Sequence, residues 1–217
     1  NYSVFSISRS KATNVSFHQI TADLSDTTEA INAINSVFTN IDSNSISSIT
    51  LLNNAGSLGE VNTVGNLDSE KIQQTIQLNT TTPLVLSNEF IKLTKELSCK
   101  KQIINISSGA ATNPYSGWSV YCTSKAALDM TTRTIATEQN EVKNGVKCVA
   151  IYPGVVDTNM QAAIRKTSEK QFKNVQRFKE LKENNELYSP KFVADKIYQI
   201  DIKNQLESGD IVDIRKF

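Results

Sequence analysis

Short apolar runs alternate with longer stretches of helical periodicity along the whole chain. The apolar runs are typical of buried strands and cover residues 4–8, 15–20, 49–53, 102–107, 146–152 and 211–214. The stretches with helical period cover residues 29–41, 68–97, 118–143 and 189–200. This alternation predicts an α/β fold, a Rossmann-like doubly wound parallel sheet with helices on both faces.

Composition narrows the class of protein. Residues 1–217 are expected to form a single domain, because no repeat or linker interrupts the pattern. Lysine and arginine number 23 against 22 acidic residues, which predicts neither a nucleic-acid nor a membrane partner. No apolar run approaches the roughly 20 residues of a membrane span and no leader is visible, so a cytoplasmic location is expected. Cys99, Cys122 and Cys148 lack metal-ligand spacing, so we expect reduced thiols and no metal site.

Tyr121 and Lys125 form a Tyr-x-x-x-Lys pair within a predicted helix. Residues four apart lie on one face of a helix, so we expect the ammonium of Lys125 beside the phenol of Tyr121. A nearby cation favours the phenolate and is expected to lower the pKa of Tyr121 from its usual value of about 10. Tyr121 is then a candidate acid and base, although many pairs with this spacing are only a half-buried phenol beside a solvated ammonium.

Two serines at the end of a predicted strand strengthen the first interpretation. Ser107 and Ser108 end the apolar run at residues 102–107 and precede Tyr121. In open parallel sheets, ligands bind in the crevice outside the carboxyl ends of the strands. A serine hydroxyl there and a tyrosine on the next helix can converge on one carbonyl oxygen, which predicts a hydride-transfer site.

In order and spacing, Ser108, Tyr121 and Lys125 resemble the catalytic residues of the short-chain dehydrogenase/reductase family. Asn79 resembles the catalytic asparagine of that family, and residues 53–56 resemble its Asn-Asn-Ala-Gly motif. The resemblance implies that Tyr121 protonates a ketone oxygen, Ser108 hydrogen-bonds that oxygen, Lys125 holds the nicotinamide ribose and Asn79 organises a water.

Other segments resemble the cofactor-binding motifs of the same family. Asp23-Leu24 resembles the pair that contacts the adenine ring, and residues 153–158 resemble the segment that holds the nicotinamide. The cofactor-binding residues that the resemblance implies are Asp23, Leu24, Asn53, Ala55, Gly56, Tyr121, Lys125, Pro153, Gly154, Val156 and Thr158. Asn53 has a structural alternative, in which its side chain ties neighbouring strands together.

The end of the first predicted strand indicates which nicotinamide cofactor is used. NAD-specific Rossmann domains place an acid there, whereas NADP enzymes use an arginine for the 2′-phosphate. Residues 8–11 are Ser-Arg-Ser-Lys and contain no acid, so Arg9 and Ser10 are expected to bind NADPH. A solvated basic turn is the alternative.

The resemblance also implies a first strand and a glycine-rich turn, and both should precede Asn1. Because that strand lies in the middle of the family's sheet, we expect that about 30 residues of the natural protein are absent from this sequence. A natural truncated product is the alternative.

Residues 51–60, 117–125 and 156–161 resemble the branch of the family that contains sepiapterin and benzil reductases. The ending, residues 208–214, places Asp213 where that branch anchors a pterin, although a final strand with one exposed acid explains it equally well. The implied substrate is a small carbonyl compound, a pterin or an aromatic diketone. The residues expected to contact it are Ser108, Trp118, Gly154 and Asp213.

Residues 165–186 form either a lid or an ordinary surface helix. Phe172, Val175, Phe178 and Leu181 recur at three-residue steps, which predicts one apolar stripe on an amphipathic helix. Trp118 is expected either to line the pocket or to support the start of the helix that carries Tyr121.

The resemblance implies a homodimer. An alcohol dehydrogenase for another substrate, or an NADP-binding sensor without turnover, are the alternative functions.

Overall fold

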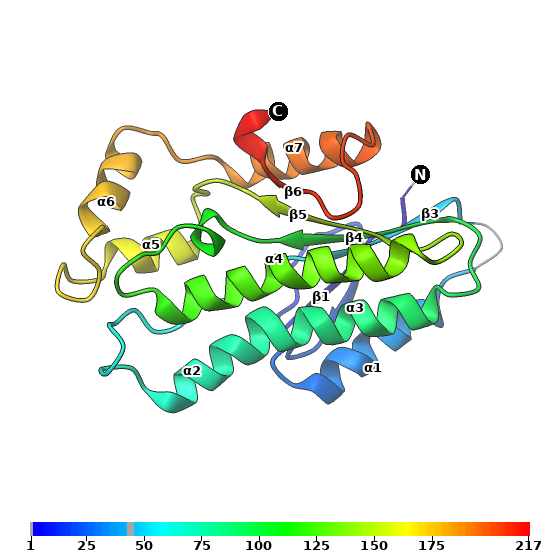
Figure 1. Cartoon of the computed structure of the whole chain (residues 1–217), viewed down its shortest axis with the longest axis horizontal. Helices are drawn as coiled ribbons and strands as arrows, with labels where there is room; N and C mark the ends of the chain where they lie inside the picture. Colours follow the sequence, from blue (N-terminus) through cyan, green and yellow to red (C-terminus); the bar gives the residue numbers. More distant parts are fainter. Residues whose placement is uncertain (1, 43–45) are drawn as a thin grey trace.

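The computed structural model describes residues 2–42 and 46–217, and its strands lie in two parallel groups (Figure 1). In one group, β1 (Phe5–Ser8) pairs with β2 (His18–Thr21). The other group has the order β3 (Ser48–Asn53), β4 (Lys100–Ile106), β5 (Lys147–Tyr152) and β6 (Ile211–Asp213). All of these pairings are parallel, so the carboxyl ends within a group reach one edge, and the predicted doubly wound sheet is confirmed.

β1 and β3 each pair with one neighbour among the described residues. Each of these strands therefore has one edge that is not paired with another described strand. The backbone N–H and C=O groups on that edge are available to pair with an added strand. The family resemblance leads us to expect a further strand between β1 and β3, and that expectation stays a prediction.

Helices cover both faces of the sheet (Figure 1). α1 (Thr27–Phe38), α3 (Thr82–Leu93) and α4 (Ser119–Asn140) lie on one face, and α7 (Pro190–Ile202) lies on the other. The N-terminal caps of α1 and α7 follow from the sequence, because the side chains of Asp26 and Ser189 each accept a bond from a first-turn backbone N–H.

The middle of β4 contributes to a separate core on each face. Ile103 is fully buried and packs in the cluster that contains Phe90 of α3, whereas Ile104 packs in the cluster that contains Ile200 of α7. Successive side chains of a strand point to opposite faces, so one short apolar run supplies both layers.

A π-helical turn interrupts the helical run that carries Asn79. α2 (Ser69–Ile76), capped by Asp68, continues through the π-helix η1 (Gln77–Thr81) into α3. Pro83 has no N–H for the carbonyl of Asn79 four residues before it, and the wider turn accommodates this loss without breaking the run. The predicted helix therefore exists, with a π-turn beside Pro83 and an end at Leu93 instead of Leu97.

Buried amides tie the sheet to the helices beneath it. The Asn53 amide nitrogen donates to Asn105 Oδ1 (2.8 Å) and to Ser87 Oγ (3.3 Å), and the Asn105 amide nitrogen donates to Thr132 Oγ1 (2.9 Å). These bonds connect β3, β4, α3 and α4. Of the two roles considered for Asn53, the structure shows the bracing role, and its cofactor contact stays a prediction.

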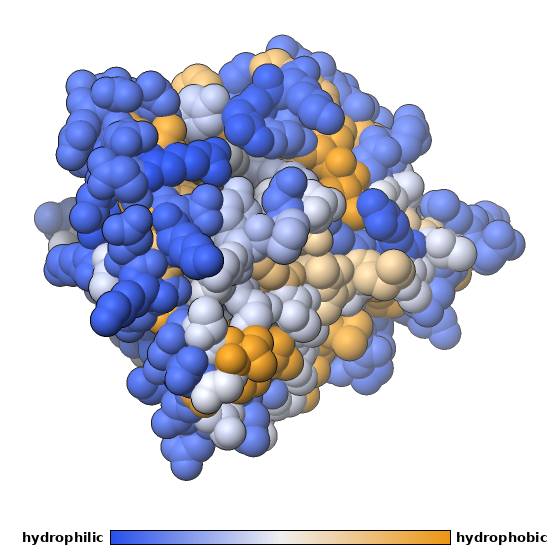
Figure 2. Space-filling view, turned by 60° about the vertical axis from the view of Figure 1, so that its left-hand side comes forward, coloured by the Kyte–Doolittle hydropathy of each residue, from blue (hydrophilic) through white to orange (hydrophobic). Residues whose placement is uncertain are grey.

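α5 (Asn159–Arg165) and α6 (Val175–Glu183) lie beyond the carboxyl ends of the strands (Figure 1). The single amphipathic helix predicted over residues 165–186 is thus wrong in its bounds, because the helix within that range, α6, covers only Val175–Glu183. The apolar stripe is nevertheless buried, and Phe172 and Phe178 are 0% and 4% exposed. Figure 2 brings this side of the molecule forward and shows a mostly hydrophilic surface with hydrophobic residues in separate patches.

Candidate active site

The predicted catalytic residues Ser108 and Tyr121 meet at the carboxyl end of β4. Ser108 follows that strand and starts the short 3₁₀ turn η2 (Gly109–Ala111), where its hydroxyl oxygen accepts a bond from Ala110 N (3.2 Å). Tyr121 lies in the first turn of α4, and its phenol is close enough to the Ser108 side chain for the two to interact. A carbonyl oxygen placed between these two hydroxyls would be within hydrogen-bonding reach of both.

Burial, and not the neighbouring ammonium, dominates the pKa of Tyr121. The side chain is 9% exposed, and this burial raises the pKa of the phenol, while the Ser108 hydroxyl acts in the opposite direction. The expectation that Lys125 lowers this pKa is therefore wrong for the protein without ligands. At neutral pH the phenol keeps its proton, which is the state that a proton donor requires.

Lys125 holds a buried ammonium under the site. Its side chain is 6% exposed, and Nζ donates to the carbonyl oxygen of Ile106 at 2.8 Å, at the end of β4. Nζ lies 5.8 Å from the centre of the Tyr121 ring. Burial lowers the pKa of Lys125 to about 8, and the negative charge of Asp129 partly offsets this effect.

Asn79 also lies close to Lys125. Its side chain is 1% exposed, its Oδ1 accepts from Ser57 N (2.8 Å), and its Nδ2 donates to Ser57 O (2.7 Å) and to Ser124 Oγ (3.0 Å). A Cβ atom on Gly56 would lie 3.4 Å from Asn79 Oδ1 and 3.7 Å from Lys125 Nζ. The loop after β3 therefore runs directly past both side chains, and a glycine permits this approach.

Asp129 and Tyr152 were not among the predicted site residues, yet both belong to this network. Asp129 lies one helical turn after Lys125 and is 5% exposed. Tyr152, at the end of β5, donates its hydroxyl to Asp129 Oδ2, while Oδ1 has no hydrogen-bond partner within residues 2–42 and 46–217. The i, i+4 spacing from Lys125 was the available signal, but only the fold shows that this carboxylate is buried.

The residues predicted to bind the adenosine end lie after β1 and β2. Arg9 and Ser10 are exposed at the end of β1, and Asp23 follows β2. Bonds from Ser25 hold the pKa of Asp23 below its usual range, and the charge of Arg9 acts weakly in the same direction. The Leu24 side chain instead packs in the core at 8% exposure, which leaves its backbone as the part that can face a ligand.

The segment after β5 follows the same edge of the sheet. Gly154 has a φ of +72°, and a Cβ there would lie 2.8 Å from the ring of Tyr188. Val156 forms an isolated bridge with Tyr188, and Thr158 is the residue before α5. Pro153 and Gly154 thus turn the chain at the site, the Tyr188 ring packs against Gly154, and the contact of Gly154 with substrate stays a prediction.

Trp118 anchors the α5–α6 segment to the start of α4. Its ring stacks on Phe172 (centroids 4.4 Å apart, planes at 7°) and meets Tyr121 edge-on at 5.8 Å. At 6% exposure it lies within a cluster that includes Phe178, so the structure shows the supporting role considered for it. A cavity of about 510 Å³ opens beside this segment, lined by the loop at residues 56–61, by α5 and by Gln171.

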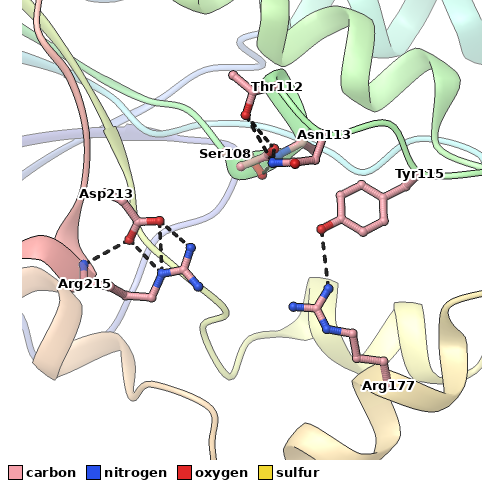
Figure 3. A network of polar contacts seen from close by, with 9 residues as sticks. Ser108, Thr112, Asn113, Tyr115, Arg177, Asp213 and Arg215 are labelled. Atoms are coloured by element: carbon pink, nitrogen blue, oxygen red, sulfur yellow. Dashed lines mark hydrogen bonds and ion pairs between the residues drawn. The ribbon is translucent and has the colours of Figure 1, made fainter.

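Asp213 ends β6 and forms an ion pair with Arg215, near Ser108 (Figure 3). In the part of the chain that the structure describes, no group of three or more His, Cys, Asp or Glu side chains is arranged to hold a metal ion. Within the same residues, none of the helices has both the length and the apolar character that crossing a bilayer requires.

The fold and this arrangement define a nicotinamide-dependent oxidoreductase site on a Rossmann-type sheet. The chain belongs to the short chain dehydrogenase family, whose model matches residues 6–169. It is similar to a benzil reductase ((S)-benzoin forming) from Bacillus subtilis, with 42% identity over 219 residues that cover 100% of this chain and 89% of the relative. A sepiapterin reductase from Xenopus laevis is 29% identical over 88% of this chain and 72% of its own length.

A solved short chain dehydrogenase/reductase from Saccharomyces cerevisiae shares the fold, with a TM-score of 0.80 and 24% identity. The superposition covers 98% of this chain and 85% of the yeast chain. These comparisons confirm the predicted family and its benzil and sepiapterin reductase neighbours.

Replacing Asp129 with Asn tests whether its charge acts on Lys125. The amide keeps an oxygen that accepts from Tyr152 but removes the charge that raises the pKa of Lys125, so this pKa should fall below about 8. If activity needs the Lys125 ammonium, the fall of kcat/KM at high pH should begin at a lower pH in this variant. Glu138→Gln removes an exposed charge from the same helix and should leave the profile in place. An unmoved fall at high pH in Asp129→Asn would contradict this coupling.

Replacing Gly117 with Ala tests how the α5–α6 segment is held. Gly117 has a φ of +94°, and a Cβ there would lie 2.1 Å from the carbonyl oxygen of Gln171, a backbone atom without a rotamer to change. We expect a loss of about 2 kcal/mol or more in the free energy of unfolding, measured in urea, together with a raised KM for substrate. Gly65→Ala is the matched control, because Gly65 has a φ of +98° with open space around it. Equal losses in both variants would show that the close approach is unimportant.

Proposed function

We propose that the protein reduces a small ketone or diketone, using NADPH as the hydride source and Tyr121 as the proton donor. The observation that carries this proposal is the convergence of Ser108, Tyr121, Lys125 and Asn79 at the carboxyl ends of the strands. The benzil reductase with 42% identity supports the same reaction class.

The residues present fit a nicotinamide nucleotide. One of the three N–H donors of the Lys125 ammonium is used by the Ile106 carbonyl, so two can reach the hydroxyls of a ribose. Gly56 lies beside that ammonium, because a Cβ on it would be 3.7 Å from Nζ, and without a Cβ this space is left for a ligand. When bound there, the cofactor supplies the hydride that attacks the carbonyl carbon.

The chain itself would supply the proton and the orientation. Ser108 and Tyr121 would both donate to the substrate oxygen, and Tyr121 would transfer its proton as negative charge develops on that oxygen. The ammonium of Lys125 would then stabilise the resulting phenolate, and its lowered pKa makes it able to return a proton at mildly basic pH. Asn79 would complete the route to solvent through a water near its carbonyl oxygen, which receives no bond from Pro83.

The 2′-phosphate of NADPH would be bound by Arg9 and Ser10. Both are exposed at the carboxyl end of β1, where NAD-specific domains place an acid. The guanidinium of Arg9 supplies paired donors that match a phosphate. Homodimer formation, the single domain and the cytoplasmic location stay predictions.

The proposed reaction is tested by incubating the protein with benzil and NADPH and measuring the loss of NADPH absorbance. Tyr121→Phe keeps the aromatic packing with Trp118 but removes the proton donor, so kcat should fall by about 100-fold or more. Tyr198→Phe changes an exposed tyrosine on α7 and should retain activity. Full activity in Tyr121→Phe would refute the assigned role, and no turnover of benzil or of other ketones would refute the reaction.

Replacing Arg9 with Asp tests the choice of cofactor. The change removes the phosphate partner and adds a charge that repels it, so KM for NADPH should rise by about tenfold or more, while KM for NADH changes little. Lys95→Asp makes the same charge change at the far end of α3 and should not affect the ratio. Equal increases in KM for both cofactors would contradict the assignment.

A further inference from the structure

Asp213 lies at the same edge of the sheet as Ser108. β6 pairs with β5, and Asp213 is in register with Tyr152, while β4 lies on the other side of β5. Two strand spacings of about 4.8 Å separate β4 from β6, so Asp213 is roughly 10 Å across the sheet edge from Ser108. A ketone with two linked or fused rings that bonds to Ser108 would extend its far end toward this position.

Arg215 uses most of the acceptor capacity of the Asp213 carboxylate. Oδ1 accepts from Arg215 N (3.0 Å), Nε–H is shared between Oδ1 (2.8 Å) and Oδ2 (3.0 Å), and Oδ2 also accepts from a terminal guanidinium nitrogen. A carboxylate has about four lone-pair sites, and three N–H groups of one residue bind to them. The Asp213 side chain is 12% exposed, whereas that of Arg215 is 55% exposed, so the guanidinium covers the acid from the solvent side.

The guanidinium of Arg215 remains exposed on the side that faces away from Asp213. Figure 3 shows it pointing away from β6, toward the side that carries Tyr115, whose hydroxyl accepts from Arg177 of α6 (3.5 Å). This part of the sheet edge therefore presents the cationic N–H donors of Arg215 more than the carboxylate of Asp213.

We propose that Arg215 is a specificity-determining residue, which closes Asp213 to the substrate and so selects aryl diketones over pterins. This inference rests on the proposed carbonyl reduction. The amino-pyrimidinone edge of a pterin presents N–H donors, and a paired carboxylate is the acceptor that satisfies them, whereas guanidinium donors repel them. An aryl ketone needs no such acceptor, and a flat guanidinium stacks well on an aromatic face.

The Asp213–Arg215 pair could instead serve only to end β6, because Asp213 also caps the turn η3 (Ile214–Lys216). Arg215→Met separates the two roles. The backbone N–H that caps the turn is retained, the hydrophobic stem is retained, and only the guanidinium is lost. Lys216→Met is the matched control, since it removes a neighbouring cation from the same turn without exposing Asp213.

The test compares kcat/KM for sepiapterin and for benzil in these variants. In Arg215→Met, kcat/KM for sepiapterin should rise by about 10- to 100-fold through a lower KM, because a charged acceptor becomes available. Activity with benzil should stay within about threefold of the wild type. The double variant Arg215→Met/Asp213→Asn should lose the gain, and Lys216→Met should show none.

An unchanged sepiapterin kcat/KM in Arg215→Met would overturn the proposal, as would a gain that survives in the double variant. Failure of the proposed function is recognised separately, because the wild type would then reduce neither benzil nor sepiapterin. In that case, calorimetric titration with sepiapterin decides about Arg215. Tighter binding to Arg215→Met than to wild type supports the closure of Asp213, and equal binding rejects it.

Discussion

A buried ammonium, that of Lys125, is the constraint on which the site depends. Burying a charge costs free energy, and a hydrogen bond from Nζ to the Ile106 carbonyl at the end of β4 (2.8 Å) offsets part of this cost. That bond fixes the first turns of α4 against the sheet, and with them the position of Tyr121. Because burial also lowers the pKa of Lys125 to about 8, the same group can exchange protons near physiological pH.

The surrounding elements are arranged around that ammonium. The π-turn at residues 77–81 carries Asn79 inward, where it bonds to both Ser57 and Ser124 and joins the loop after β3 to α4. The loop at Gly56 lies beside the same groups, because a Cβ there would be in ordinary van der Waals contact with Asn79 and Lys125. Lys125, Asn79 and Gly56 are therefore one unit, in which a change at any member would alter the space available to a nicotinamide ribose.

Most of the fold and the core of the site could be predicted from the sequence, because they depend on local pattern. The apolar runs located the strands, and the Tyr-x-x-x-Lys spacing with Ser108 located the site. The direction in which the pKa of Tyr121 shifts could not be predicted. It depends on the burial of the phenol beneath Trp118 and α6, and the tertiary fold brings these groups together. Periodicity likewise placed the start of the helix in residues 165–186 too early, because Phe172, which precedes α6, is buried against Trp118 without being helical.

The pairing of Asp213 with Arg215 could not be predicted from the local sequence pattern either. In a continuing strand, residues 213 and 215 would point to the same face at some distance, but the chain turns directly after Asp213 and folds Arg215 back onto it. A position that resembles a substrate anchor is therefore occupied by a residue of the chain itself. Family resemblance locates the carboxylate, and only the three-dimensional arrangement shows what it binds.

Isotope transfer from the cofactor tests the central claim most directly. The protein would be incubated with benzil and NADPH carrying deuterium at the transferable C4 position, and the product would be analysed by mass spectrometry and NMR. The account predicts one deuterium on the new carbinol carbon and unlabelled oxygen-bound hydrogen, which exchanges with water. Product without carbon-bound deuterium, or no product under conditions in which NADPH binds, would contradict it.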